Sequence, residues 1–140
     1  MNKINEAKAR IKEIMDAMKL WESEYHTKKT KLILNGDETE SLDNKARHKL
    51  NDILEKYVIQ GGKNYGRLID LGTGEPTTYD FDTDQVISIE ESKKKIIYTY
   101  IRSAGFKNQY RITMQETSEG WKVKKKELLN HKEKWTAVPI

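Results

Sequence analysis

One carboxyl group of the sequence, that of Asp70, is a candidate general acid or base because its neighbours in the chain are apolar. Asp70 lies between Ile69 and Leu71, and an apolar environment raises the pKa of a carboxyl group toward the range useful for proton transfer. This pattern keeps open an enzyme of the isomerase or dehydratase class, although the tyrosines that could serve such a site would serve equally well as core residues with one hydrogen bond each. The tyrosines that could donate a hydrogen bond to this carboxylate are Tyr25, Tyr57, Tyr98 and Tyr100.

The other reactive residue types are not arranged for catalysis or for metal binding. His26, His48 and His131 are far apart, no two of them have the spacing of metal ligands on a helix, and the chain has no cysteine. The stretch GTGEP lacks the lysine and the following helix of a phosphate-binding loop, and GGKNYG follows a predicted helix instead of a strand. The sequence therefore predicts no metal, no cofactor and no nucleophile motif.

Composition indicates a folded protein with a modest core. The chain has 140 residues, of which 36% are hydrophobic and 34% are charged, so a single domain over residues 1–140 is expected. The first residues carry charges throughout, which is typical of neither a signal peptide nor a membrane span. The lack of cysteine suits a reducing compartment, and the expected location is the cytoplasm.

The formal charge of +4 hides a strong segregation of charge along the chain. Residues 1–74 are nearly balanced, with 14 bases and 12 acids, whereas residues 93–140 carry 12 bases and four acids. Residues 75–92, here named the acidic band, contain six acids and no base. Such a dipolar surface suits a protein partner better than a uniform polyanion. The six acids are Glu75, Asp80, Asp82, Asp84, Glu90 and Glu91.

Hydrophobic periodicity divides the chain into a helical part and a sheet. Apolar residues at three- and four-residue steps predict a helix over about residues 3–27, with a continuation toward Leu34 left open. A second helix is predicted from Asp43, as N-cap, to Gly61-Gly62, which places the helices within about residues 3–62.

The sheet is predicted over about residues 65–140. It starts with a short strand or extended piece before Pro76, and from residue 85 alternating apolar residues predict consecutive strands joined by short turns. The order of elements predicts an α+β fold in which the helices pack on one face of a curved antiparallel sheet.

The alternation also assigns side chains to the two faces of the sheet. Tyrosines, tryptophan and aliphatic residues fall on the face that the helices would cover, whereas the opposite face is largely basic. That opposite face could bind a partner or form a homodimer. It could also bind nucleic acid, but the aromatic residues on which bases would stack lie on the covered face, which disfavours this alternative. The named residues of this second candidate surface are Ile97, Ile101, Arg111, Lys122 and Lys124.

Short motifs from Ala46 to Trp135 resemble those of a known family. The resemblance is to the immunity proteins with a nuclear transport factor 2-like fold, which are encoded beside polymorphic toxins, including Rhs-type toxins. The residues that carry it are Arg47, Leu50, Tyr57, Arg67-Leu68, Glu75-Pro76, Tyr79-Asp80, Gly105-Phe106, Tyr110-Arg111, Gly120-Trp121 and Trp135.

This resemblance implies a cone-shaped α+β fold without catalytic residues of its own and a cognate toxin as partner, bound directly in the producing cell. The acidic band is then the first candidate for the contact, because its charges could speed the encounter while apolar residues within it anchor the complex. The contact residues expected there are Glu75, Tyr79, Asp80, Asp82, Asp84, Glu90 and Glu91, with Phe81, Val86 and Ile87 as further anchors.

Overall fold

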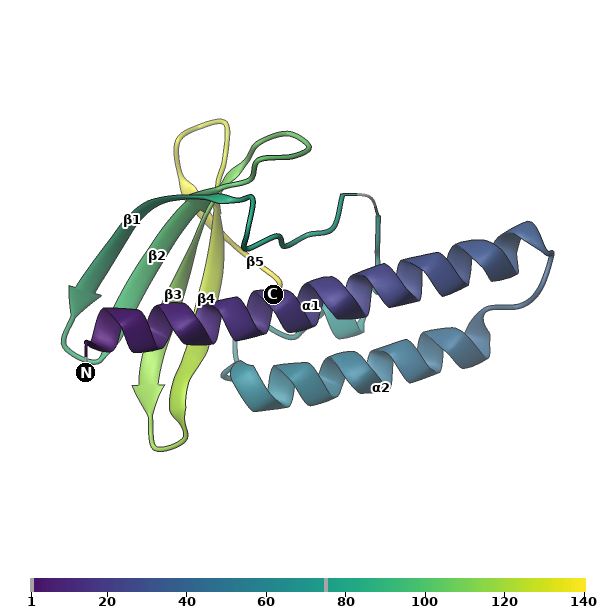
Figure 1. The fold of residues 1–140 in the computed structure, drawn as a ribbon, viewed down its shortest axis with the longest axis horizontal. Coiled ribbons are helices and arrows are strands. Elements are labelled where there is room, and N and C mark those ends of the chain that lie inside the picture. Colours follow the sequence, from purple (N-terminus) through teal and green to yellow (C-terminus); the bar gives the residue numbers. More distant parts are fainter. Residues whose placement is uncertain (1, 75) are drawn as a thin grey trace.

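The computed structural model describes residues 2–74 and 76–140 as two helices packed on one face of a five-stranded antiparallel sheet (Figure 1). The strands follow one another in the order β1-β2-β3-β4-β5, so the sheet is a simple meander. This confirms the predicted α+β architecture. The elements are α1 (Lys3–Leu34), α2 (Glu40–Tyr57), the short 3₁₀ helix η1 (Gly66–Leu68), β1 (Gln85–Ser92), β2 (Lys95–Ile101), β3 (Gln109–Thr117), β4 (Gly120–Leu129) and β5 (Trp135–Val138).

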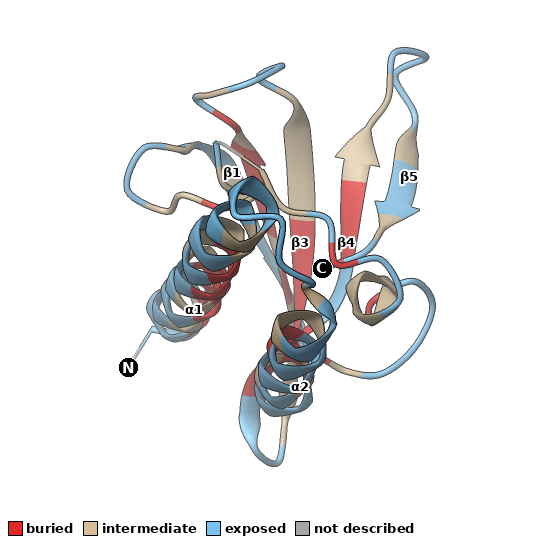
Figure 2. Cartoon of the chain, turned by 90° about the vertical axis from the view of Figure 1, so that its right-hand side faces the viewer, coloured by how far each residue is buried: buried red, intermediate tan, exposed pale blue. Residues whose placement is uncertain are grey.

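Helix α1 ends at Leu34, so the continuation beyond residue 27 that the sequence left open is present. The Asn2 side chain caps it by accepting a hydrogen bond from the Ile4 amide at 2.8 Å, and the helix ends where Gly36 adopts a positive φ of 74°. Its apolar stripe packs against the sheet and α2, as the red inner surface in Figure 2 shows. The buried residues of this stripe include Ala7, Ile11, Ile14, Met15, Met18, Trp21 and Tyr25.

Helix α2 begins four residues earlier than predicted, and Asp43 is not its N-cap. Thr39 occupies that position, while Asp43 lies in the first turn and accepts hydrogen bonds from the Thr39 hydroxyl (3.0 Å) and the Tyr25 hydroxyl (2.5 Å). The helix also ends earlier than Gly61-Gly62, because Val58 is extended and forms a parallel bridge with Val123 of β4.

The segment after α2 differs from the prediction of an extended piece. Residues 66–68 form η1, and the sheet begins only at Gln85, so residues 65–74 and 76–84 lie between the two layers without joining the sheet. Close packing explains the first residue of η1, since a Cβ atom on Gly66 would lie 3.0 Å from the Cγ atom of Pro139.

The register of the sheet confirms the predicted covered face. Ile96 is opposite Met114 and Tyr98 is opposite Ile112, and all four side chains are buried beneath the helices. Strand β4 then contains a bulge, because Thr113 pairs with Lys125 whereas the next residue of β3, Met114, pairs with Val123.

This bulge reverses the alternation of side chains in the second half of β4. Trp121 and Val123 face the helices, as predicted, but Lys126 also faces them, although strict alternation from Trp121 would place it on the outer face. A lysine is therefore built into the covered face of the sheet.

We expect Trp121→Ala to lower the free energy of unfolding by about 3–5 kcal/mol, because Trp121 is buried in the core cluster and its removal leaves a cavity. Phe106→Ala is the matched control, since Phe106 is 95% exposed and its loss should change stability by about 0.5 kcal/mol or less. Urea denaturation measures both. A loss below about 1 kcal/mol for Trp121→Ala would contradict the described register.

Candidate contact surface and the network beneath it

The structure divides the acidic band into carboxylates that hold the fold together and carboxylates that face solvent. Asp84 is paired with Arg102 at 2.8 Å, and Asp80 is paired with Lys19 at 3.0 Å. The exposed members are Asp82, Glu90 and Glu91, which have no ion pair among the described residues. Glu75, the sixth acid of the band, lies outside the described residues.

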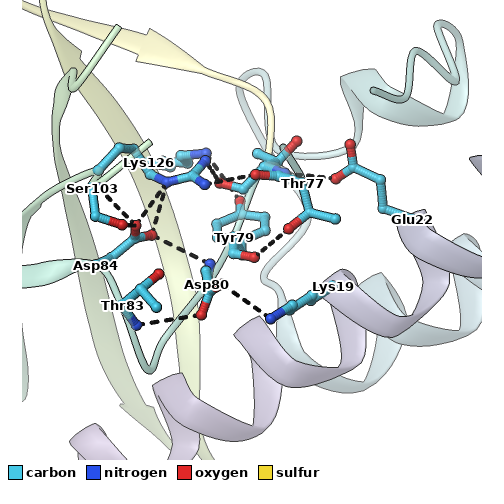
Figure 3. A network of polar contacts seen from close by, with 11 residues as sticks. Lys19, Glu22, Thr77, Tyr79, Asp80, Thr83, Asp84, Ser103 and Lys126 are labelled. Atoms are coloured by element: carbon cyan, nitrogen blue, oxygen red, sulfur yellow. Dashed lines mark hydrogen bonds and ion pairs between the residues drawn. The ribbon is translucent and has the colours of Figure 1, made fainter. Parts of the chain in front are cut away.

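Arg102, directly after β2, is the centre of a buried polar network. Figure 3 shows this network from close by, with Thr77, Asp84 and Ser103 among its members. Its guanidinium group donates to the Asp84 carboxylate at 3.0 Å, to the Thr77 carbonyl at 2.6 Å and to the Thr78 carbonyl. The Asp84 carboxylate also accepts a hydrogen bond from the backbone amide of Ser103 at 3.1 Å. The Arg102 and Asp84 side chains are only 11% and 3% exposed, so these bonds fix residues 77–84 against the end of β2.

Helix α1 holds the same segment from the other side. The buried Glu22 carboxylate accepts the Thr78 amide at 2.9 Å and lies 3.4 Å from the Arg67 guanidinium. Partial burial alone would raise the pKa of Asp80, but the hydrogen bond from Lys19 reverses this effect and lowers it below its usual value. The segment is thus clamped between the helical layer and the sheet.

Tyr79, predicted as a surface anchor, instead points into the core and is 1% exposed. Its hydroxyl accepts a hydrogen bond from the Lys126 Nζ atom at 3.1 Å, and the same Nζ atom lies 4.4 Å from the Tyr79 ring centroid and 4.6 Å from that of Tyr110. Burial raises the pKa of the Tyr79 hydroxyl, which therefore stays neutral as an acceptor. In this conformation Tyr79 is not available to a partner.

Lys126 is the residue that sequence reasoning missed. Burial, with a smaller contribution from the neighbouring Arg67 and Arg102, lowers the pKa of its amine to about 7, and the carboxylates of Glu22 and Asp84 oppose this shift. The run KVKKKE gave no signal that one lysine turns inward, because only the bulge in β4 decides which one does.

The exposed part of the acidic band forms what we name the acidic edge surface. It combines the carboxylates of Asp82, Glu90 and Glu91 with the exposed aliphatic side chains of Val86 and Ile87. All but Asp82 belong to β1, which is an end strand of the sheet, visible at the outer side of the ribbon in Figure 1. Charges surrounding apolar anchors are the composition expected of a protein contact.

The outer sheet surface contains the second set of predicted residues, and much of it is engaged within the chain. Arg111 binds Glu127 through two hydrogen bonds of 2.8 and 3.3 Å and stacks 4.3 Å from the Trp135 ring centroid. Lys122 is paired with Glu119 at 3.5 Å. Ile97 and Ile101 are half-buried, and Lys124 is exposed beside Lys95, which lowers the pKa of Lys124.

The buried carboxylate expected at Asp70 is not found. Asp70 is exposed, its Oδ1 atom accepts the Gly72 amide at 3.3 Å, and its neighbour Ile69 is 88% exposed. The turn of η1 directs this part of the chain to the surface, so apolar neighbours in sequence do not produce an apolar environment. The enzyme hypothesis built on a buried Asp70 is therefore wrong.

Two further searches of the described residues gave negative results. Residues 2–74 and 76–140 contain no cluster of three or more histidine, aspartate or glutamate side chains that could hold a metal ion. Among the same residues, no helix combines the length and the apolar character needed to cross a membrane.

Comparison with known proteins gives two matches that agree. The model of a family described as NTF2 fold immunity protein matches residues 6–138. The chain is also 27% identical over 136 residues to Immunity protein RhsIA of Dickeya dadantii (strain 3937), and the match covers 96% of each protein. No solved structure matches significantly.

We expect Arg102→Gln to lower the free energy of unfolding by about 3–5 kcal/mol, because it leaves the buried Asp84 carboxylate without its counter-charge. Lys12→Gln, which breaks the exposed pair with Asp16, should have a much smaller effect and is the control. Urea denaturation measures the two losses, and limited proteolysis should show faster cleavage in residues 77–84 of Arg102→Gln. Equal losses for the two variants would refute the role given to Arg102.

We expect Lys126 to make stability rise with pH between about 7 and 9.5. The folded-state pKa of about 7 lies below the usual 10.5, so in this window the unfolded chain binds a proton that the folded chain does not. The penalty for burying Lys126 is fully present below pH 7 and is relieved as the pH rises, by up to about 1.4 kcal/mol per unit. Urea denaturation at pH 7, 8 and 9 should show this rise for the wild type and a flatter profile for Lys126→Met. Parallel profiles would show that folding does not lower the pKa of the Lys126 amine.

Proposed function

The chain belongs to the NTF2 fold immunity proteins, and from this premise we propose that it recognises its toxin through the acidic edge surface. As an immunity protein it neutralises a toxin. We assign that toxin to the Rhs-type systems, since the relative from Dickeya dadantii is named RhsIA. The protein acts by stoichiometric binding, without catalytic residues, in the cytoplasm of the producing cell, a location that the lack of cysteine suits.

The observation that carries this proposal is the division of the acidic band. Asp80 and Asp84 are occupied by Lys19 and Arg102, so their charges are neutralised within the chain. Glu90 and Glu91 are exposed without such partners in the described residues, and they share β1 with the exposed Val86 and Ile87. A basic toxin surface would complement these carboxylates and cover the aliphatic side chains.

The outer sheet surface is the second candidate, for the toxin or for a second copy of this chain. It offers the partly exposed Ile97 and Ile101 and the exposed Lys124. The bidentate pair of Arg111 and Glu127 argues against the outer sheet surface, because these two charges already neutralise each other within the chain. The acidic edge surface has no comparable internal pairing among the described residues and is therefore preferred.

Reversing the charges of the acidic edge surface should weaken toxin binding by about 100-fold or more, mainly through slower association. The variant carries Asp82→Lys, Glu90→Lys and Glu91→Lys. The control carries Asp37→Lys, Glu38→Lys and Glu40→Lys, three exposed acids around the start of α2, and so makes the same change in net charge. Surface plasmon resonance with the toxin encoded beside the gene gives both rate constants, and cell survival gives the protection.

Circular dichroism must first show that both variants fold. Unchanged binding by the folded acidic-edge variant would move the contact to the outer sheet surface, where Ile97→Asp and Ile101→Asp would then abolish it. A wild-type protein that neither binds nor protects against the toxin would contradict neutralisation by direct binding.

A further inference from the structure

Strand β1 leaves one side of its backbone free. It stands at the end of the sheet order and pairs with β2, and in the described chain no other segment pairs with it. It is eight residues long and six of these are exposed, whereas β5 at the opposite edge has four residues and is followed by Pro139. An unpaired strand of this length presents a row of amide and carbonyl groups that can bind another strand.

The charge of β1 disfavours pairing with a second copy of itself. Two antiparallel copies of residues 85–92 would bring four carboxylates together without any base. A strand that carries basic side chains meets no such repulsion.

We propose that β1 accepts an extended basic segment of the toxin as a sixth strand of the sheet. This inference rests on the proposed function and adds the mode of binding: backbone hydrogen bonds supply the common part of the affinity, and side chains supply the selectivity. The segment is a strand of the toxin because immunity requires a heterologous partner, and it is basic because the free carboxylates lie on the strand itself.

The positions of the carboxylates define the side chains of that segment. Glu90 is opposite Ile97 and Glu91 is opposite Ile96, so the two carboxylates leave the strand toward opposite faces of the sheet. A bound segment therefore carries basic residues at adjacent positions, one for each face. Near the start of β1, the exposed side chains of Val86 and Ile87 would pack against an apolar residue of the segment.

The buried network prepares β1 for this role. Asp84 directly precedes the strand and is fixed by Arg102 and by the amide of Ser103. The beginning of β1 is therefore held in place before any partner arrives, which lowers the entropy cost of binding.

Amide hydrogen exchange followed by NMR tests the proposal in the wild-type protein. In the free protein the β1 amides that point toward β2 should exchange slowly and those at the free edge quickly. In the complex with an inactive variant of the toxin encoded beside the gene, the fast amides of residues 86–91 should slow by about 100-fold or more. A complex in which these amides keep their fast exchange overturns strand addition but leaves toxin binding intact, whereas failure to form any complex contradicts the proposed function itself.

A proline variant tests the same backbone contact separately. Ser88→Pro or Ile89→Pro, whichever replaces an amide that exchanges quickly, removes a donor from the free edge and spares the hydrogen bonds to β2. It should weaken toxin binding by about 100-fold relative to alanine at the same position. Equal affinities of the two variants overturn the proposal. A free protein that sedimentation shows to be a dimer, with its edge amides already protected, would assign β1 to a second copy and overturn it as well.

Discussion

The guanidinium group of Arg102 fixes the segment that joins the two layers of this protein. It stands at the end of β2 and binds a carboxylate and two backbone carbonyls of residues 77–84. Backbone carbonyls in a segment without regular structure need partners when they are buried, and a planar group with five donors can satisfy several of them at once. On the side of the sheet, the route of the chain into β1 therefore depends on this side chain, as it depends on Glu22 and Lys19 on the side of α1.

The burial of several charged side chains lowers the stability of the fold, and the arrangement of this network limits that loss. Within the part of the chain that the structure describes, two buried carboxylates, those of Glu22 and Asp84, face three cationic groups, those of Arg67, Arg102 and Lys126. The imbalance is relieved at the lysine, because an amine with a pKa of about 7 can lose its proton near neutral pH, whereas a guanidinium group cannot. Two tyrosine rings take the place of a third carboxylate around the amine.

The sequence was sufficient to predict the order of elements and most of the covered face of the sheet. Periodicity depends on neighbours within a few residues, and it was enough to place Ile96 and Met114 on the same covered face. The fate of the acidic band could not be predicted in this way. Asp84 and Asp80 find their partners 18 and 61 residues away, in Arg102 and Lys19, so local composition does not distinguish them from Glu90.

Because the acidic band contains both paired and exposed carboxylates, a loss of toxin binding would have different causes at different positions of the band. Under the proposed function, a substitution at Asp84 would remove the counter-charge of Arg102 and disturb the start of β1, and so reduce toxin binding indirectly. A substitution at the exposed Glu90 would leave that network intact and act on the proposed contact itself. Asp84 and Glu90 contribute equally to the net charge of the acidic band, but they differ in burial. In the proposed complex, the buried Asp84 supports the contact surface from within, whereas the exposed Glu90 is part of that surface.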